Sequence, residues 1–342
     1  MKEQIERAQH IVIFTHMAPD GDAMGSALAM WHWCKSKVER RKSKDESVTV
    51  IVPNAFPAFL GWMPGAEEIR IYEQKAQECD RLIAEADLFI CTDFNDPKRI
   101  GPMGEKMIAN PCEKILIDHH IMDERVKGLA DEGFWAEVHS HPEASSACEI
   151  VYRLIGSMTE EIATCIYTGL MTDTGNFSYN SNNPEIYEIV ASLLRAGAKK
   201  DEIYDRVFNQ YSTDRMRLTG YALYRKMRIF PEHHLALITL TASELEQYHY
   251  KQGDCEGLVN MPLQIGDVFY SVFMREERPK PGTPKPRIRI SFRSQGDRPV
   301  NIWASEVFHG GGHMNASGGE LFGSLEQAVK LFENTYKNYL KQ

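Results

Sequence analysis

The first group of residues that could do chemistry is His16, Asp20 and Asp22, which fall within seven positions. They lie on a Pro/Gly turn that follows an apolar run and opens an expected helix. One Asp would be enough to cap that helix, but the second Asp and the His exceed what capping needs. Imidazole and carboxylate groups together are typical ligands of divalent cations. The spacing therefore favours a metal-binding turn.

Three further groups of the same kind follow later apolar segments. The first is Asp93, within Thr-Asp-Phe. The second is the consecutive run of Asp118, His119 and His120, and the third is Asp173, within Met-Thr-Asp-Thr-Gly. Taken singly, each has an ordinary explanation as a turn residue, a surface pair or a polar helix end. Taken together, they place carboxylate and imidazole groups, which are ligands of the same kind, at the ends of several expected strands and helices.

Five aspartates in one crevice would repel one another, which would raise their pKa values and destabilise the fold. Divalent cations remove that conflict. Carboxylates mixed with imidazoles, without thiolates, suit two Mn²⁺ ions, with Mg²⁺ or Co²⁺ as alternatives. Two cations sharing one Asp would polarise a phosphorus centre and lower the pKa of a bridging water. Hydroxide would then be the nucleophile in the hydrolysis of a phosphate ester.

A second cluster lies in the C-terminal part, where residues 308–319 form a glycine-rich segment with His and Asn inside it. We expect a loop there, because consecutive glycines let backbone N–H groups approach an anion closely. An Arg-Ser pair that ends a predicted strand could grip a phosphate, since Arg binds phosphate in a bidentate manner. A flexible turn and a surface arginine remain the alternatives. The candidate substrate-binding residues are Arg293, Ser294, Gly311, Gly312, His313 and Asn315.

The elements that must position the first groups alternate between strand and helix. Short apolar runs bounded by charged or turn residues predict buried parallel strands. The expected strands are 10–15, 48–52, 87–92 and 114–118, and the expected helices are 21–38, 144–155 and 160–171. This alternation predicts an α/β fold with a doubly wound, mainly parallel sheet. The candidate ligands follow the carboxyl ends of the strands, where such sheets bind their ligands.

The pattern changes after about residue 215, which predicts a smaller α/β C-terminal domain. Expected strands are 234–240, 268–275 and 287–293, with a Pro-rich basic turn at 278–286 and a last helix at 324–340. Helices at 184–196 and 201–210 would connect the two parts. We therefore predict a catalytic domain at 1–186, a helical linker at 187–214 and a substrate-binding domain at 215–342.

The distribution of charge limits the kinds of molecule that the protein is expected to bind. The chain carries a net −9, but residues 213–342 carry +3 and the first 212 residues carry −12. This acidic total argues against binding to duplex DNA. No apolar run is long enough to span a bilayer, and the N-terminal residues lack the pattern of a signal peptide. We therefore expect a cytoplasmic protein that does not bind membranes.

These groups, in this order, resemble the DHH phosphoesterase family, which is named for the run seen here at Asp118, His119 and His120. The resemblance covers nearly the whole chain, including the Gly-Gly-Gly-His segment typical of the DHH-associated C-terminal domain. Size and arrangement are most similar to the nano-RNase type. That type degrades very short oligoribonucleotides and dephosphorylates 3′-phosphoadenosine 5′-phosphate (pAp), so the resemblance implies such substrates.

The resemblance also implies a role for each residue. His16, Asp20 and Asp93 would hold one cation, while Asp22, Asp93, His119 and Asp173 would hold the other. His120 would face the substrate phosphate, and Asp118 would orient a neighbouring His. Arg293, Ser294, His313 and Asn315 would bind substrate from the second domain, with Arg99 as a weaker candidate.

Other activities share parts of this pattern. A hydrolase of linear dinucleotides such as pApA or pGpG is close to the favoured interpretation. An inorganic pyrophosphatase would carry Ser-Arg-Lys in its second domain, and that triplet is absent. A long-DNA exonuclease would be larger. A nucleotide-binding module without catalysis belongs to a different class, and the intact ligand set argues against it. The oligomeric state stays open, with a homodimer as one alternative.

Overall fold

The computed structural model describes residues 1–38, 47–279 and 285–340. The chain forms two compact units, Met1–Gln210 and Tyr211–Gln342. The helices at 184–195 and 200–208 belong to the first unit, and a linker role for residues 187–214 stays a prediction. Among the described helices, none has both the length and the apolar character needed to cross a membrane.

The first unit is built on six parallel strands in the order β3-β2-β1-β4-β5-β6. Their bounds are β1 (Ile11–Phe14), β2 (Val48–Val52), β3 (Arg70–Ile71), β4 (Leu88–Thr92), β5 (Glu113–Asp118) and β6 (Glu137–Ser140). Central strands β1, β2 and β4 are buried along their whole length, as expected for a parallel sheet covered on both faces. The strand order reverses between β1 and β4. This arrangement confirms the predicted doubly wound sheet.

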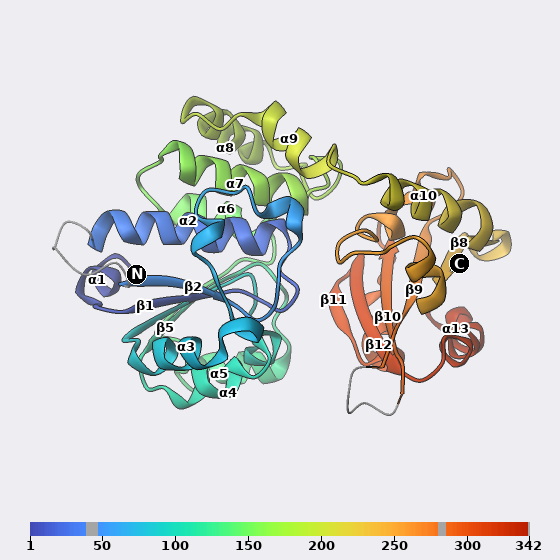
Figure 1. The fold of residues 1–342 in the computed structure, drawn as a ribbon, viewed down its shortest axis with the longest axis horizontal. Helices are drawn as coiled ribbons and strands as arrows, with labels where there is room; N and C mark the ends of the chain where they lie inside the picture. The colour runs from blue at the N-terminus through green and yellow to red at the C-terminus, as the bar shows by residue number, and fades with distance from the viewer. Residues whose placement is uncertain (39–46, 280–284, 341–342) are drawn as a thin grey trace. The chain divides into compact units, whose positions relative to one another are not determined.

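Helices cover both faces of this sheet (Figure 1). One face carries α2 (Gly21–Val38), α6 (Ala147–Leu154) and α7 (Glu160–Asp173), and the other carries α3 (Tyr72–Glu85), α4 (Met103–Ala109) and α5 (Glu124–Asp131). The unit is completed by α1 (Lys2–Arg7), α8 (Pro184–Arg195) and α9 (Lys200–Phe208). Two apolar cores result, one on each face.

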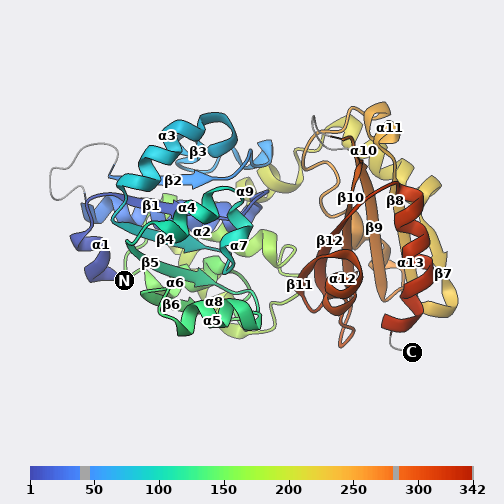
Figure 2. The ribbon, with the colours of Figure 1, turned by 90° about the horizontal axis from the view of Figure 1, so that it is seen from below.

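The second unit is a six-stranded mixed sheet in the order β11-β12-β10-β9-β8-β7, in which only β8 and β9 pair in parallel. Its strands are β7 (Arg228–Phe230), β8 (Leu235–Leu240), β9 (Tyr270–Glu277), β10 (Arg287–Ser294), β11 (Gly311–His313) and β12 (Ala316–Phe322). Its α-helices are α10 (Thr213–Tyr221), α11 (Ala242–Gln247), α12 (Asn301–Phe308) and α13 (Leu325–Tyr339), with α12 and α13 beside the sheet (Figure 2). Phe292 of β10 packs against Trp303 of α12 in the core of this unit, with the two rings tilted by 57°.

The glycine-rich segment predicted as a loop is instead mostly a hairpin at the edge of this sheet. Strands β11 and β12 pair antiparallel, and only residues 314–315 form the turn. A β carbon at Gly310 would lie 1.8 Å from the Gly318 oxygen, and one at Gly312 would lie 2.6 Å from the Ala316 oxygen. These glycines therefore allow two strands to approach closely. The strands on either side of the predicted basic turn, β9 and β10, pair antiparallel, and residues 280–284 of that turn lie outside the described part of the chain.

Candidate metal centre

The candidate ligands gather where the strand order of the first unit reverses. His16 follows β1 and Asp93 follows β4, and these strands are neighbours in the sheet. Open α/β sheets bind their ligands at such a switch point. The backbone of Asp93 is left-handed, with φ of 64°, and its N–H donates to the Ile117 oxygen at 2.9 Å. A non-glycine residue in that region is strained, and such strain concentrates at functional sites.

The first group comprises His16, Asp20 and Asp93. Nε2 of His16 lies 3.3 Å from Asp93 Oδ2 and 3.9 Å from Asp20 Oδ2. The Nδ1 of His16 lies 3.0 Å from the Met17 oxygen, so a proton on Nδ1 leaves the Nε2 lone pair facing the carboxylates. Oδ1 of Asp20 accepts the N–H groups of residues 22 and 23 and caps α2. Asp20 thus caps the helix with one oxygen and keeps the other beside His16.

The second group surrounds His119. Its Nε2 lies 3.4 Å from Asp93 Oδ1, 3.7 Å from Asp22 Oδ2 and 3.6 Å from Asp173 Oδ2. Its Nδ1 lies 3.4 Å from the Ala144 oxygen, which again directs the Nε2 lone pair toward the carboxylates. Asp93 therefore turns Oδ2 toward the first group and Oδ1 toward the second, which is the geometry a bridging ligand requires.

Burial and charge show that this cluster suits cations. Asp22 is 1% exposed and Asp93 is 2% exposed, and Asp93 Oδ1 accepts no hydrogen bond from any residue that the structure describes. Burial and the nearby Asp93 raise the pKa of Asp22 to about 7, and burial raises the pKa of Asp173 well above its usual range. Burial also acts to raise the pKa of Asp93, but His119 and His16 outweigh it and hold that pKa well below its usual range. Without cations, buried carboxylates so close together conflict with one another.

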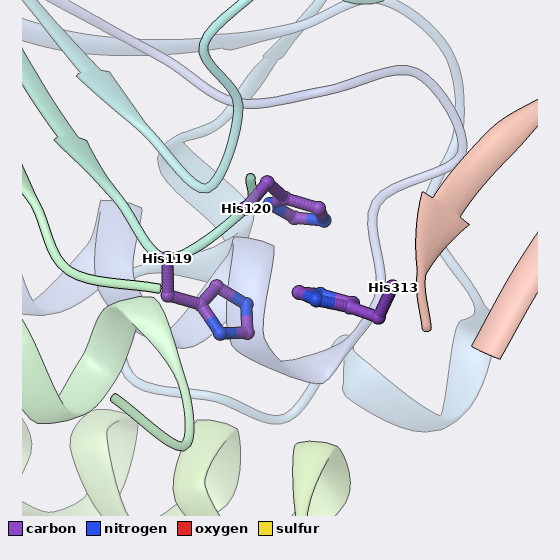
Figure 3. Close-up of side chains that lie close together, drawn as sticks. All are labelled: His119, His120 and His313. Carbon is purple, nitrogen blue, oxygen red and sulfur yellow. The ribbon is translucent and has the colours of Figure 1, made fainter. Parts of the chain in front are cut away.

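His120 differs from the histidines of the two groups. Its Nδ1 lies 2.8 Å from Asp118 Oδ1, and Asp118 is fully buried. Asn95 donates to the other Asp118 oxygen at 2.7 Å and to the His120 backbone oxygen at 3.2 Å. Figure 3 shows the His119 and His120 side chains leaving the segment after β5. Their ring centroids lie 4.9 Å apart. The third residue labelled in the figure, His313, belongs to the second unit. Asp118 thus fixes the orientation of the His120 ring through Nδ1.

Arg99 and Asn95 both lie in the segment after β4. Arg99 is exposed, and its backbone oxygen accepts the Met17 N–H at 2.8 Å, which places it beside the loop of the first group. Sequence reasoning missed Asn95. The signal was its place two residues after Asp93, because its partners come from the end of β5 and the segment after it.

In the second unit, the predicted substrate-binding residues gather at one end of β10, β12 and β11. Both Arg293 and His313 pair in register with Ala316. The Ser294 hydroxyl donates to the Arg298 oxygen and accepts from Asn315 Nδ2 at 2.9 Å, and Asn315 also donates to the Gly296 oxygen at 2.8 Å. These hydrogen bonds of Ser294 and Asn315 therefore connect the end of β10 to the turn between β11 and β12. Contacts with substrate stay a prediction for the whole set.

Comparisons with known proteins agree with the motifs. Residues 10–170 match the DHH family, N-terminal domain. A bifunctional oligoribonuclease and PAP phosphatase of Thermus thermophilus is 30% identical over 330 residues, which cover 94% of this chain and 87% of that protein. The crystal structure of an exopolyphosphatase-related protein from Bacteroides fragilis is 46% identical, with a TM-score of 0.87 over 99% of this chain and 94% of that one.

A more distant structure, that of RecJ from T. thermophilus in complex with Mn²⁺, is 11% identical. Its TM-score is 0.50 over 99% of this chain and 53% of that one, so the likeness concerns the fold alone. The family match and the close relatives cover the metal motifs and both units. The chain therefore belongs to the DHH family of phosphoesterases, as its motifs predicted.

Proposed function

We propose that the protein is a two-metal phosphoesterase that hydrolyses very short oligoribonucleotides and removes a phosphate from pAp. The observation that carries this proposal is Asp93, which turns one oxygen toward each of two His/Asp groups. The relative from T. thermophilus, named an oligoribonuclease and PAP phosphatase, supports the choice of substrate.

Two divalent cations would be held by the two groups. His16, Asp20 and Asp93 would bind one, and Asp22, Asp93, His119 and Asp173 would bind the other. Oxygen and nitrogen donors without thiolate favour Mn²⁺. Bound there, such cations supply Lewis acidity toward a phosphoryl oxygen and lower the pKa of water.

His120 would act on the substrate itself. Asp118 holds its Nδ1, and the ring oriented in this way would contact a phosphate oxygen of the substrate. Hydrogen bonds from a charged donor to phosphate are about twice as strong as neutral ones. Asn95 fixes the Asp118 carboxylate and would thereby keep the His120 ring in this orientation.

The second unit would bind the substrate end. Arg293 would pair with a phosphate, and the β11–β12 hairpin with His313 would approach the terminal nucleotide. Long single strands need an extended basic groove with aromatic platforms. Residues 275–298 carry eight Lys and Arg against three Asp and Glu, which suffices for a few phosphates. We therefore propose a length limit of about two to four nucleotides.

The test is a length series of labelled RNA from two to 24 nucleotides at fixed salt and Mn²⁺, run beside pAp, pApA and pyrophosphate. We expect kcat/KM to be highest for the shortest RNAs, with pAp also hydrolysed. A steady rise with length would indicate a processive exonuclease instead. Preference for pApA would identify a linear dinucleotide phosphodiesterase, and preference for pyrophosphate would identify a pyrophosphatase. Binding without turnover would leave only a nucleotide-binding module.

A further inference from the structure

One buried segment, residues 144–149, contacts two of the proposed ligands of the second cation and is called the brace below. All six of its residues are at most 2% exposed, and they lie at the start of α6 or just before it. The brace lies far along the chain from both ligands that it contacts. Its contacts are of two kinds, one to Asp22 and one to His119.

The brace holds Asp22 through backbone amides. Asp22 Oδ2 accepts the N–H of Ala147 at 2.6 Å, and Oδ1 accepts the N–H of Cys148 at 2.9 Å. Both donors belong to the first turn of α6, whose unsatisfied N–H groups and dipole favour a carboxylate. The Ala144 oxygen of the same brace faces Nδ1 of His119. The brace therefore fixes both a carboxylate and an imidazole of the second group.

The conformation of the brace depends on Glu149. This carboxylate is 1% exposed, and its Oε2 accepts both the N–H and the hydroxyl of Ser145, at 2.7 and 2.6 Å. Its Oε1 pairs with Arg153, which also contacts Glu185 at 2.8 Å near the surface. A buried carboxylate with every oxygen satisfied makes its surroundings rigid.

Within the described part of the chain, the two members that belong to the first group alone, His16 and Asp20, make no hydrogen bond with the brace. The Asp20 side chain is 50% exposed, and His16 Nδ1 lies against the oxygen of its own neighbour, Met17. Among the described residues, the brace contacts Asp22 and His119, which belong to the second group alone, and no hydrogen bond from it to His16 or Asp20 occurs. A change at Glu149 should therefore affect the two cation sites unequally.

We propose that Glu149 is a positioning residue that, through the brace, sets the affinity of the second cation and leaves that of the first unchanged. This inference rests on the proposed metal centre. Glu149 contacts neither a proposed ligand nor any substrate group, so its effect must pass through Asp22 and His119.

The experiment titrates Mn²⁺ into the full-length, metal-free protein by calorimetry and by electron paramagnetic resonance, without substrate. In Glu149→Gln the amide nitrogen must face either Arg153 or the two donors of Ser145, so one contact is lost. We expect one of the two ions to bind about tenfold more weakly, the low end for loss of a supporting contact behind a metal ligand. Turnover of pAp should return to the wild-type kcat when Mn²⁺ saturates.

The matched control is Glu185→Gln, which changes the other carboxylate on Arg153 and should leave both affinities as they are. A double variant, Asp20→Asn with Glu149→Gln, identifies the affected site, because the ion remaining after loss of Asp20 should still be weakened. If Glu149→Gln melts early, Ser145→Ala removes one contact to Glu149 and should weaken the same ion to a smaller degree.

Equal weakening of both ions, or two unchanged affinities, would overturn the role of Glu149. Failure of the proposed function looks different. A wild-type protein that binds fewer than two Mn²⁺ ions, or binds two and cleaves neither RNA nor pAp, contradicts that proposal instead.

Discussion

The metal cluster of the first unit and the glycine-rich hairpin of the second were both predicted from residue types, but the structure treats them differently. In the cluster, Asp93 Oδ1 is buried without a hydrogen-bond donor among the described residues, and like charges crowd together. In the hairpin, Ser294 and Asn315 bond to each other, and Gly312 is needed for strand packing. Polar groups that satisfy one another explain a local fold, whereas a buried carboxylate oxygen without a donor, crowded by other carboxylates and imidazoles, fits a cation site.

The largest expected effect comes from Asp93→Ala, because both groups lose a ligand at once. Activity should fall by more than about 10³-fold, beyond the loss of a single electrostatic contact. Metal content measured by mass spectrometry should fall with it. The control is Asp96→Asn, which changes a nearby carboxylate that caps a turn and pairs with Arg125. Normal Mn²⁺ stoichiometry together with normal turnover would show that Asp93 does not bridge.

His120→Ala should be less severe and of a different kind. We expect kcat to drop by about 10²- to 10³-fold while both ions stay bound, since in the proposed site the ring would stabilise charge on the substrate. His141→Ala, at a partly exposed histidine after β6, is the control. Loss of metal as complete as in Asp93→Ala would make His120 a ligand.

Arg293→Ala tests the second unit. Loss of one charged hydrogen bond, about 1.5 kcal/mol, should raise the KM for pAp roughly tenfold. Mn²⁺ binding should not change. Arg278→Ala removes an exposed arginine that pairs with Glu246 and provides the comparison. An unchanged KM in Arg293→Ala would remove this residue from the substrate site.

The smallest effects separate packing from binding within the hairpin. A β carbon at Gly312 would clash with β12 at a φ of 137°, so Gly312→Ala should lower stability by about 1–3 kcal/mol in thermal melts. A β carbon at Gly311 meets no described atom within 4 Å, so Gly311→Ala should leave the melting temperature nearly unchanged. If substrate approaches the backbone there, its KM for dinucleotides should rise. Equal KM values for Gly311→Ala and wild type would limit the glycines to packing.

Sequence patterns predicted the central elements well, because long apolar runs set them. The bounds of β2 and α2 agree with prediction at both ends, whereas edge strands β3 and β6 were missed. Strand β3 has two residues and β6 is only partly buried, so neither leaves a clear pattern. Helix α6 begins at Ala147, three residues later than predicted, because Ser146 caps it.

The proposed metal ligands could be predicted from the sequence, but the residues that hold those ligands in position could not. Asn95 and Glu149 are ordinary polar residues until the fold brings partners from other elements beside them. The Ser146 and Glu149 pair has the spacing of a capping box. In the structure Glu149 bonds to Ser145 instead, and only the buried packing around it shows this.

The brace contacts Asp22, which lies far from it in the sequence, and this separation has a consequence for biosynthesis. Asp22 is made early, but the amides that hold it belong to residues 147 and 148, and Asp173 comes later still. Contacts so distant in sequence form late in folding, because the chain between them must first be ordered. A nascent chain that ends before Asp173 lacks one of the proposed ligands, so it cannot complete the second cation site. Hydrolytic activity would thus arise only after the first unit has left the ribosome, and an interrupted translation product would be inert toward RNA.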